Sequence, residues 1–297
     1  MQQPRNLLTG VVSALRPRQW IKNGLVIIAP AAAGQITSGA TLRHTAEAFV
    51  AFTLAASGLY LINDLRDREA DRLHPTKKFR AIASGVVPVP IALVLAVGLL
   101  LGATAISWCA GASGHDLFFV VATYITLTVA YSMVLKRQPV IEFAIVASGF
   151  FLRALGGAVA SDLYVSSWFL AVTAFAALFL VIGKRTAELK ELGSNAGAHR
   201  AVLAEYTPEF LRSALTLVAS AVVTTYCLWA FEVGQAPSTL PWAQWSVLPF
   251  VLAILRYGVA IDRGKAEAPE DAVLHDKALL VIGGVWLLLF GLGALGA

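Results

Sequence analysis

Residues 46–72 of the chain are AEAFVAFTLAASGLYLINDLRDREADR, an apolar run that ends directly in a stretch of charge. Successive residues of a helix are about 100° apart around its axis, so residues within an arc of roughly 100° share one face. Four oxygen-bearing side chains share that face: Asn63, Asp64, Asp67 and Asp71. Carboxylates gathered in this way repel one another unless a cation joins them. Mg²⁺ suits such oxygens, because it takes one or two protein carboxylates and completes its shell with substrate phosphates.

We therefore predict that Asn63, Asp64, Asp67 and Asp71 are Mg²⁺ ligands, and that the three aspartates are catalytic. The alternative is a solvated helix end on which Arg66 and Arg68 form ion pairs with the acids. The metal interpretation is favoured because the apolar run before Asn63 belongs in a membrane.

The composition indicates an all-α polytopic membrane protein. The 297 residues are 58% hydrophobic and 14% charged, with a mean hydropathy of +0.72, whereas about a quarter of the residues of a soluble domain are charged. No segment alternates apolar and polar residues as a barrel strand does. Nine apolar segments have the length of a membrane-spanning helix: 20–37, 46–63, 88–111, 116–135, 140–160, 166–183, 210–232, 244–261 and 278–297.

The positive charges predict the orientation. All but Arg43 and Arg153 of the 23 Lys and Arg residues lie at one set of segment ends, in or next to the amino-terminal arm and the connections after the second, fourth, sixth and eighth segments. The positive-inside rule places that side, with the amino terminus and the acidic face, in the cytoplasm of a plasma-membrane protein. The net charge of +5 thus reflects topology and phosphate binding, and we expect no nucleic-acid partner.

The first 19 residues are predicted to lie in the membrane surface as an amphipathic segment, and residues 20–297 to form one transmembrane catalytic domain. The arm carries apolar residues at helical spacing: Leu7, Leu8, Val11, Val12 and Leu15. Cys109 and Cys227 are isolated in or near apolar segments and give neither metal-ligand spacing nor a disulfide framework.

Basic residues near the acidic face are candidates for phosphate binding. Pro75 is expected to end the helix, which leaves Lys77 and Arg80 on a loop near the carboxylates, while Lys78 is attributed to the positive-inside pattern. Lys22 lies one turn into an apolar run, where an ammonium either snorkels to the surface or faces a polar cavity. Asn23 beside it favours the cavity.

Further charges lie at the ends of later segments. Lys136 follows the fourth segment and either marks the membrane boundary or pairs with Glu142. Arg153 is deeper, with Asp162 as a candidate partner and a structural role as the alternative. Lys184 and Glu188 are spaced i,i+4, as in a surface ion pair, but follow the sixth segment as the aspartates follow the second.

Three motifs resemble those of the UbiA-type intramembrane prenyltransferases: Asn63-x-x-x-Asp67-x-x-x-Asp71 with Asp64 alongside, Arg16-Pro-x-x-Trp20-x-Lys22-Asn23, and Tyr131-Ser-x-x-Leu-Lys136. The resemblance implies about nine helices around a cavity that opens to the cytoplasm, with Mg²⁺ at the aspartates. It also implies substrate contacts from Lys22, Asn63, Lys77, Arg80, Tyr131, Lys136, Lys184, Arg185 and Glu188.

The sequence departs from the usual superfamily pattern at one motif, and this difference indicates a particular branch of the superfamily. Most members of the superfamily carry a second aspartate-rich motif after the sixth helix, where this chain has Lys184-Arg185-Thr-Ala-Glu188-Leu. With Glu69-Ala-Asp-Arg-x-His74-Pro-Thr-Lys77, Tyr206-Thr-Pro-Glu-Phe-Leu-Arg212 and Ala253-Ile-Leu-Arg256-Tyr257, the sequence resembles the phosphoribosyltransferase branch. That implies transfer of 5-phosphoribose from phosphoribosyl pyrophosphate to decaprenyl phosphate. The products would be diphosphate and decaprenylphosphoryl 5-phosphoribose, a precursor of decaprenylphosphoryl arabinose and cell-wall arabinan.

Two other functions stay open at the level of sequence. An aromatic prenyltransferase of the same fold would use a polyprenyl diphosphate, but would normally carry the second acidic motif. A transporter or lipid flippase would explain Lys22 and Arg153 within the membrane, but gives no reason for four ligand oxygens on one face. The acceptor chain length is not encoded in the motifs, and neither is the oligomeric state, for which a homo-oligomer is possible.

Overall fold

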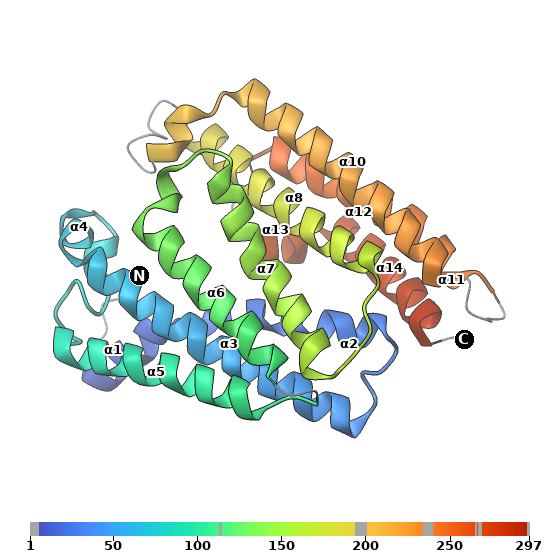
Figure 1. Cartoon of the computed structure of the whole chain (residues 1–297). Coiled ribbons are helices and arrows are strands. Elements are labelled where there is room, and N and C mark those ends of the chain that lie inside the picture. Colours follow the sequence, from blue (N-terminus) through green and yellow to red (C-terminus); the bar gives the residue numbers. More distant parts are fainter. Residues whose placement is uncertain are drawn as a thin grey trace. The chain divides into compact units, whose positions relative to one another are not determined.

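The computed structural model describes residues 6–112, 115–193, 201–233, 240–264, 266 and 269–295. These residues form helices and no strands (Figure 1), which confirms the predicted all-α class. Eight helical segments are long and apolar enough to cross a membrane: α3 (Gly39–Arg66), α5 (Val89–Cys109), α6 (Asp116–Met133), α7 (Ile141–Ala160), α8 (Ser167–Leu192), α10 (Pro208–Val233), α11 with α12 (Trp242–Asp262) and α14 (Lys277–Leu295).

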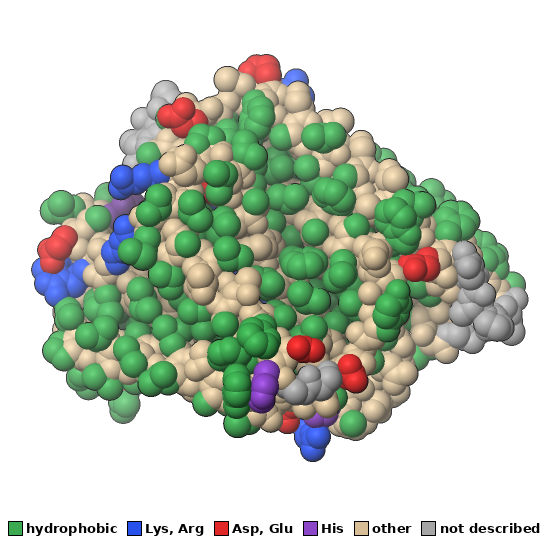
Figure 2. Space-filling model, in the orientation of Figure 1, with side chains coloured by type: hydrophobic (Ala, Val, Ile, Leu, Met, Phe, Trp, Pro, Cys, Tyr) green, Lys and Arg blue, Asp and Glu red, His purple; other side chains and the backbone are tan. Residues whose placement is uncertain are grey.

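Shorter helices connect them: α1 (Leu7–Leu15), η1 (Pro17–Ile27), α2 (Ile28–Ala32), α4 (Arg68–Leu73), η2 (Lys77–Phe79), η3 (Leu135–Arg137), η5 (Ala201–Glu205) and α13 (Pro269–His275). Apolar side chains are spread across the face drawn in Figure 2. Large apolar side chains are exposed on four different spanning helices, among them Val94, Leu217, Leu248 and Val281. Apolar surface on this scale indicates a protein surrounded by lipid.

The chain divides into two compact units, which are described separately. Unit 1 comprises residues 1–28, 38–132 and 152–163, and unit 2 comprises residues 29–37, 133–151 and 164–297. Helix α7 contributes residues to both.

The first predicted span, 20–37, is not one long α-helix. It consists of the 3₁₀ helix η1, the short helix α2 and a turn. Lys22, Asn23 and Gly24 interrupt its apolar run, and Pro30 and Gly34 follow. Irregular backbone at membrane depth is tolerated where protein covers it. Asn23 and Val26 are indeed buried, and a Cβ at Gly157 would lie 1.8 Å from the Val26 carbonyl oxygen.

The segment nevertheless runs along the carboxyl-terminal half of α3. Arg16, just before η1, binds Asp64 near the carboxyl end of α3. Trp20 Nε1 then donates to Ser57 Oγ (3.1 Å), and Asn23 Nδ2 to Thr53 Oγ1 (3.0 Å), each contact lying further from the aspartates. The chain must therefore return to the opposite end of a 28-residue helix before α3 can begin, a distance of about 40 Å. The described residues thus contain eight long spanning helices, and the first predicted span does not add a ninth.

Helix α1 packs onto unit 1 by its small residues. Gly10 and Ala14 are buried, and a Cβ at Gly10 would lie 2.8 Å from a methyl of Val86. Leu8 and Val12 are exposed on the other face. This amphipathic arrangement is the one expected of a helix in a membrane surface.

In unit 2, α8 packs against α10 and α12, and α12 packs against α14. Phe143, Val181, Leu203 and Leu211 belong to one buried apolar cluster there. This core fixes the carboxyl end of α8, which carries the second group of predicted site residues.

Candidate functional site

The predicted acidic face spans a break between two helices. Helix α3 ends at Arg66 and α4 begins at Arg68, with Asp67 between them. Helical hydrogen bonds continue across the break, because the Asp67 N–H donates to the Asn63 carbonyl (2.9 Å) and the Asp71 N–H to the Asp67 carbonyl (2.8 Å). The four-residue spacing that the sequence predicts is thus preserved in the backbone.

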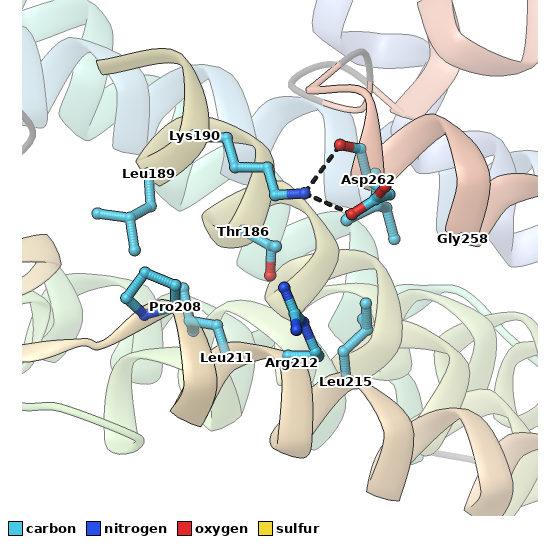
Figure 3. A pocket seen from close by; sticks show the side chains of 10 residues that line it. Thr186, Leu189, Lys190, Pro208, Leu211, Arg212, Leu215, Gly258 and Asp262 are labelled. Atoms are coloured by element: carbon cyan, nitrogen blue, oxygen red, sulfur yellow. Dashed lines mark hydrogen bonds and ion pairs between the residues drawn. The ribbon is translucent and has the colours of Figure 1, made fainter. Parts of the chain in front are cut away.

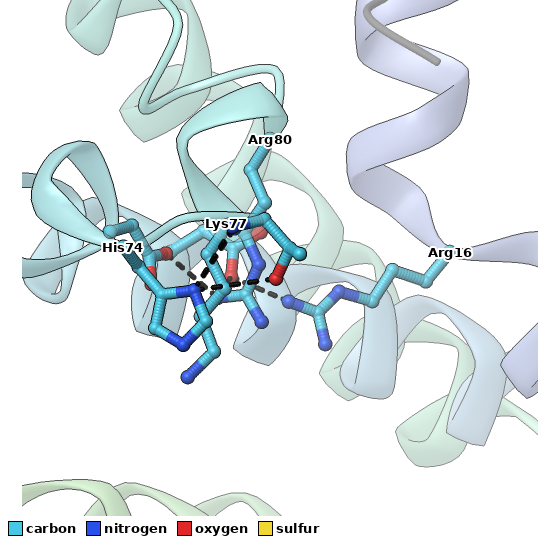
Figure 4. Close-up of polar contacts among 7 residues, drawn as sticks. Arg16, His74, Lys77 and Arg80 are labelled. Atoms are coloured by element: carbon cyan, nitrogen blue, oxygen red, sulfur yellow. Dashed lines mark hydrogen bonds and ion pairs between the residues drawn. The ribbon is translucent and has the colours of Figure 1, made fainter. Parts of the chain in front are cut away.

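Asp64 and Asp71 converge on one arginine (Figure 4). Arg80 Nη1 lies 3.2 Å from Asp64 Oδ1 and 2.7 Å from Asp71 Oδ2, and Arg16 Nη2 lies 2.5 Å from Asp64 Oδ1. We call these four residues the aspartate cluster. The acid side chains are 6% and 5% exposed, whereas those of Arg16 and Arg80 are 28% and 21% exposed. Two buried carboxylates are therefore neutralised by two cations that remain reachable from outside.

The aspartate cluster has fewer acidic ligands than the sequence predicted. Among the described residues no three His, Cys, Asp or Glu side chains gather as metal ligands would, so the structure does not assemble Asp64, Asp67 and Asp71 into one such group. Asn63 and Asp67 are half-buried beside the two converging acids. Two carboxylates that share one guanidinium nitrogen are nevertheless a set that fits Mg²⁺, which needs only one or two from the protein.

The loop after α4 has the predicted form. Helix α4 ends at Leu73, two residues before Pro75. His74 Nδ1 then accepts hydrogen bonds from the N–H groups of Thr76 (3.2 Å) and Lys77 (3.3 Å), and this turns the chain toward Arg80. Figure 4 shows His74, Lys77 and Arg80 around the cluster. Sequence reasoning missed this role of His74, although its place before Pro75 was a signal.

Two further predicted residues can be placed in unit 1. Arg66 donates to the carbonyl of Ser132, and this fastens the end of α6 to the end of α3, so the neighbouring Tyr131 lies at the aspartate end of the unit. Half-buried Lys22 lies between Trp20 and Asn23 along η1. Because those residues contact Ser57 and Thr53, the backbone of Lys22 runs beside α3, on the side of Asp64 that leads to the amino end of α3.

Arg153 has partners that the sequence did not predict. Its Nε donates to Asn23 Oδ1 (2.7 Å), its Nη2 donates to the Tyr124 hydroxyl (2.9 Å), and its guanidinium lies 4.6 Å from the centre of the Tyr124 ring. These contacts replace the expected pairing with Asp162, which lies past the end of α7 in a left-handed conformation. Asn23 therefore helps to hold a buried arginine.

In unit 2, Arg185 is enclosed by two glutamates. Its Nε and Nη2 lie 2.7 and 3.0 Å from the two carboxylate oxygens of Glu142, and its Nη1 lies 2.8 Å from Glu188 Oε2. The side chains of Arg185 and Glu142 are 3% and 0% exposed. We call these three residues the glutamate cluster. The sequence offered Lys136 as a candidate partner for Glu142, but the bidentate partner is Arg185, 43 residues away.

The remaining basic residues of unit 2 are more accessible. Lys184 is 40% exposed, and its Nζ lies 3.7 Å from Glu188 Oε1, which confirms the i,i+4 pair. Lys136 is half-buried on η3. Arg185 is thus already bound to two acids, while Lys184 can reach a ligand.

Together these features define a polytopic α-helical membrane protein in which each unit carries a cluster of charged side chains. The model of the UbiA prenyltransferase family matches residues 24–280, and the chain belongs to that family.

Two curated relatives match nearly the whole chain. A decaprenyl-phosphate phosphoribosyltransferase of Corynebacterium glutamicum is 46% identical over 290 residues, covering 96% of this chain and 87% of the relative. The enzyme of the same name from Mycobacterium tuberculosis strain H37Rv is 44% identical over 296 residues, covering 98% and 96%.

Solved structures share the fold. A UbiA homologue from Archaeoglobus fulgidus bound to GPP and Mg²⁺ superposes with a TM-score of 0.70 at 18% identity, covering 97% of this chain and 100% of that one. A digeranylgeranylglyceryl phosphate synthase gives a TM-score of 0.68 at 16% identity, covering 98% and 99%. At these identities the likeness establishes the fold alone.

Proposed function

We propose that this protein transfers the 5-phosphoribosyl group of phosphoribosyl pyrophosphate to decaprenyl phosphate, releasing diphosphate and forming decaprenylphosphoryl 5-phosphoribose. The observation that carries the proposal is an identity of 44–46% over nearly the whole chain to enzymes with that name. The product would serve decaprenylphosphoryl-arabinose and cell-wall arabinan synthesis.

The aspartate cluster suits the donor. Asp64 and Asp71 would hold Mg²⁺, with Asn63 and Asp67 completing the oxygen set, and the bound ion would neutralise the leaving diphosphate. Arg16 and Arg80 are exposed enough to exchange their carboxylate partners for donor phosphates, which guanidinium groups bind in bidentate geometry. Lys77 follows His74 on the same loop and would add a third cation.

The basic residues of unit 2 suit an acceptor that carries a monophosphate. Lys136 and Lys184 would contact phosphate directly, whereas Arg185 would act as a positioning residue that holds Glu142 and Glu188 in place. A monophosphate carries less charge than a diphosphate. A lysine–arginine pair in place of the second aspartate-rich motif is consistent with that difference.

The chemistry requires little of the protein beyond charge and position. Departure of diphosphate leaves positive charge developing on the ribose C1, as in other glycosyl transfers. Arginine and lysine side chains stabilise the negative charge on the leaving group. The acceptor phosphate is already an anion, so its attack on C1 needs no strong general base.

We further propose that the aspartate cluster faces the cytoplasm of the plasma membrane and that α1 lies in the cytoplasmic interface. The arginine and lysine distribution and the exposed apolar face of α1 support this orientation. Residues 1–19 would then be an interfacial segment attached to a single transmembrane catalytic domain.

The deciding experiment is a membrane assay with ribose-labelled phosphoribosyl pyrophosphate and decaprenyl phosphate, with Mg²⁺ or with EDTA. We expect label in the lipid fraction that EDTA abolishes. In Asp71→Asn the rate should fall by about 10²–10³-fold, as for loss of one group that stabilises transition-state charge.

Glu69→Gln is the matched control, because Glu69 lies on the same helix as Asp71 but pairs with Arg68 and Arg72 on the surface. It should retain wild-type turnover. The opposite outcome is that no lipid is labelled in any sample and that the protein instead transfers an isoprenyl group from its diphosphate to an aromatic acid. That result would establish the prenyltransferase alternative.

A further inference from the structure

Unit 2 contains a pocket that the proposed reaction does not use. It lies between α8, α10 and α12 and holds about 530 Å³, including open solvent at its mouth. Leu211, Leu215 and Ile261 contribute apolar wall (Figure 3). Lys190, Arg212 and Asp262 contribute charge.

The pocket has one excess positive charge. Lys190 Nζ lies 2.5 Å from Asp262 Oδ1 and 2.8 Å from the Asp262 carbonyl oxygen, so these two charges compensate. In Figure 3 the Arg212 side chain extends into the pocket below this pair. Within the described part of the chain, no hydrogen bond or ion pair engages its guanidinium group. Arg212 belongs to one of the sequence motifs, yet the proposed mechanism gives it no role.

The pocket lies on the opposite face of α8 from the glutamate cluster. Thr186 and Lys190, which line it, are each two residues from Glu188. Two residues correspond to about 200° around a helix, so their side chains point away from that of Glu188. The pocket is therefore separate from Lys184, Glu188 and the phosphate contacts proposed for them.

We propose that this pocket binds an anionic phospholipid, with the head-group phosphate on Arg212 and Lys190 and an acyl chain along the leucines. The three helices that form it cross the membrane, and the pocket lies where α8 and α12 end and α10 begins. Cations at that level attract the anionic lipids of the bilayer surface. The amino-terminal end of α10 adds partial positive charge. Because the ligand contacts three helices, bound lipid stabilises unit 2.

The test uses the full-length purified protein with phosphatidylglycerol, phosphatidylcholine or inorganic phosphate. We expect phosphatidylglycerol to raise the melting temperature and to give a lipid adduct in native mass spectrometry, and the other two additives to do neither. Arg212→Gln should weaken phosphatidylglycerol binding about fivefold, the contribution of one cation near a charged bilayer surface. Arg212→Lys should retain most of the binding, and this shows that the site still folds.

Arg263→Gln is the matched control, because Arg263 is exposed one residue beyond Asp262 but does not line the pocket. It should bind phosphatidylglycerol as the wild type does. Equal binding by Arg212→Gln, or equal stabilisation by phosphatidylcholine, would overturn the proposal. If inorganic phosphate gave the same Arg212-dependent rise in melting temperature, the ligand would be free phosphate, and the lipid proposal would be wrong. Unchanged phosphoribosyl transfer in Arg212→Gln separates this site from the catalytic one.

Discussion

The aspartate cluster and the glutamate cluster combine the same kinds of side chain in opposite ways. In the aspartate cluster one nitrogen of Arg80 bridges two acids, and both arginines are partly exposed. In the glutamate cluster a buried arginine is enclosed by two glutamates, one of them fully buried. Cations that solvent can reach are able to exchange partners, whereas a buried ion pair cannot be opened without leaving a charge in an apolar interior. The first arrangement suits substrate binding and the second suits a fixed framework.

The largest expected effect is on stability, in the glutamate cluster. Arg185→Met leaves Glu142 buried without its bidentate partner and should destabilise the protein by about 3–5 kcal/mol. The double variant Arg185→Met/Glu142→Leu removes both charges and should recover most of that loss. Unfolding in mild detergent measures the difference, with Lys184→Gln as a control that should cost less than about 1 kcal/mol. Equal stability of Arg185→Met and Lys184→Gln would contradict the comparison.

The aspartate cluster should show the reverse, with a large effect on activity and a small one on stability. Arg80→Gln removes the guanidinium that we propose exchanges between Asp71 and donor phosphate. It should lower kcat/KM for phosphoribosyl pyrophosphate by about 10²-fold. Lys78→Gln, on the same loop but exposed, should be silent. If Arg80→Gln lowers the free energy of unfolding as much as Arg185→Met does, the aspartate cluster is also part of the structural framework, and the comparison fails.

A third test concerns the backbone before Glu142. Val140 has φ of +64°, a left-handed conformation that is unfavourable for a β-branched residue, and its N–H donates to the Tyr206 hydroxyl (2.9 Å). Tyr206→Phe should therefore cost about 1 kcal/mol. Val140→Gly relieves the strain, and in that background the loss at Tyr206 should shrink. A double-mutant cycle by thermal unfolding measures the coupling, and additive effects would exclude it.

The smallest effect is expected from a partly exposed ion pair. Arg256 donates two hydrogen bonds to Asp276, at 2.8 and 3.2 Å. These bonds from Arg256, with that from the Leu279 N–H, lower the pKa of Asp276 below its usual value. The carboxylate therefore contributes stability above its usual pKa of about 3.9, and this contribution is lost as the pH falls through the lowered value. Melting temperatures from neutral pH to pH 3 should fall less in Asp276→Asn than in the wild type.

Much of the fold was predictable because its determinants are local. Apolar length predicted eight of the spans as long helices, and Pro75 predicted the end of the helix that carries Asp71. The first span was predicted as a membrane-spanning helix, but this segment, interrupted by Lys22, Asn23 and Gly24, forms the 3₁₀ helix η1 and the short helix α2. Helical periodicity was enough to predict that Asp64 and Asp71, seven residues apart, share one face. Neither Arg16 beside Asp64 nor Arg185 beside Glu142 has a local signal, since these partners lie 48 and 43 residues apart.

The sequence by itself determined that this chain crosses a membrane repeatedly and carries an acidic face at the end of α3. Both properties follow from the residue order within single helices. Only the tertiary structure decided that Asp64 and Asp71 share Arg80, that Glu142 binds Arg185, and that Asn23 holds Arg153. An ion pair depends on which side chains meet and on how much water they lose. Both are properties of packing between distant segments, which periodicity and composition do not contain.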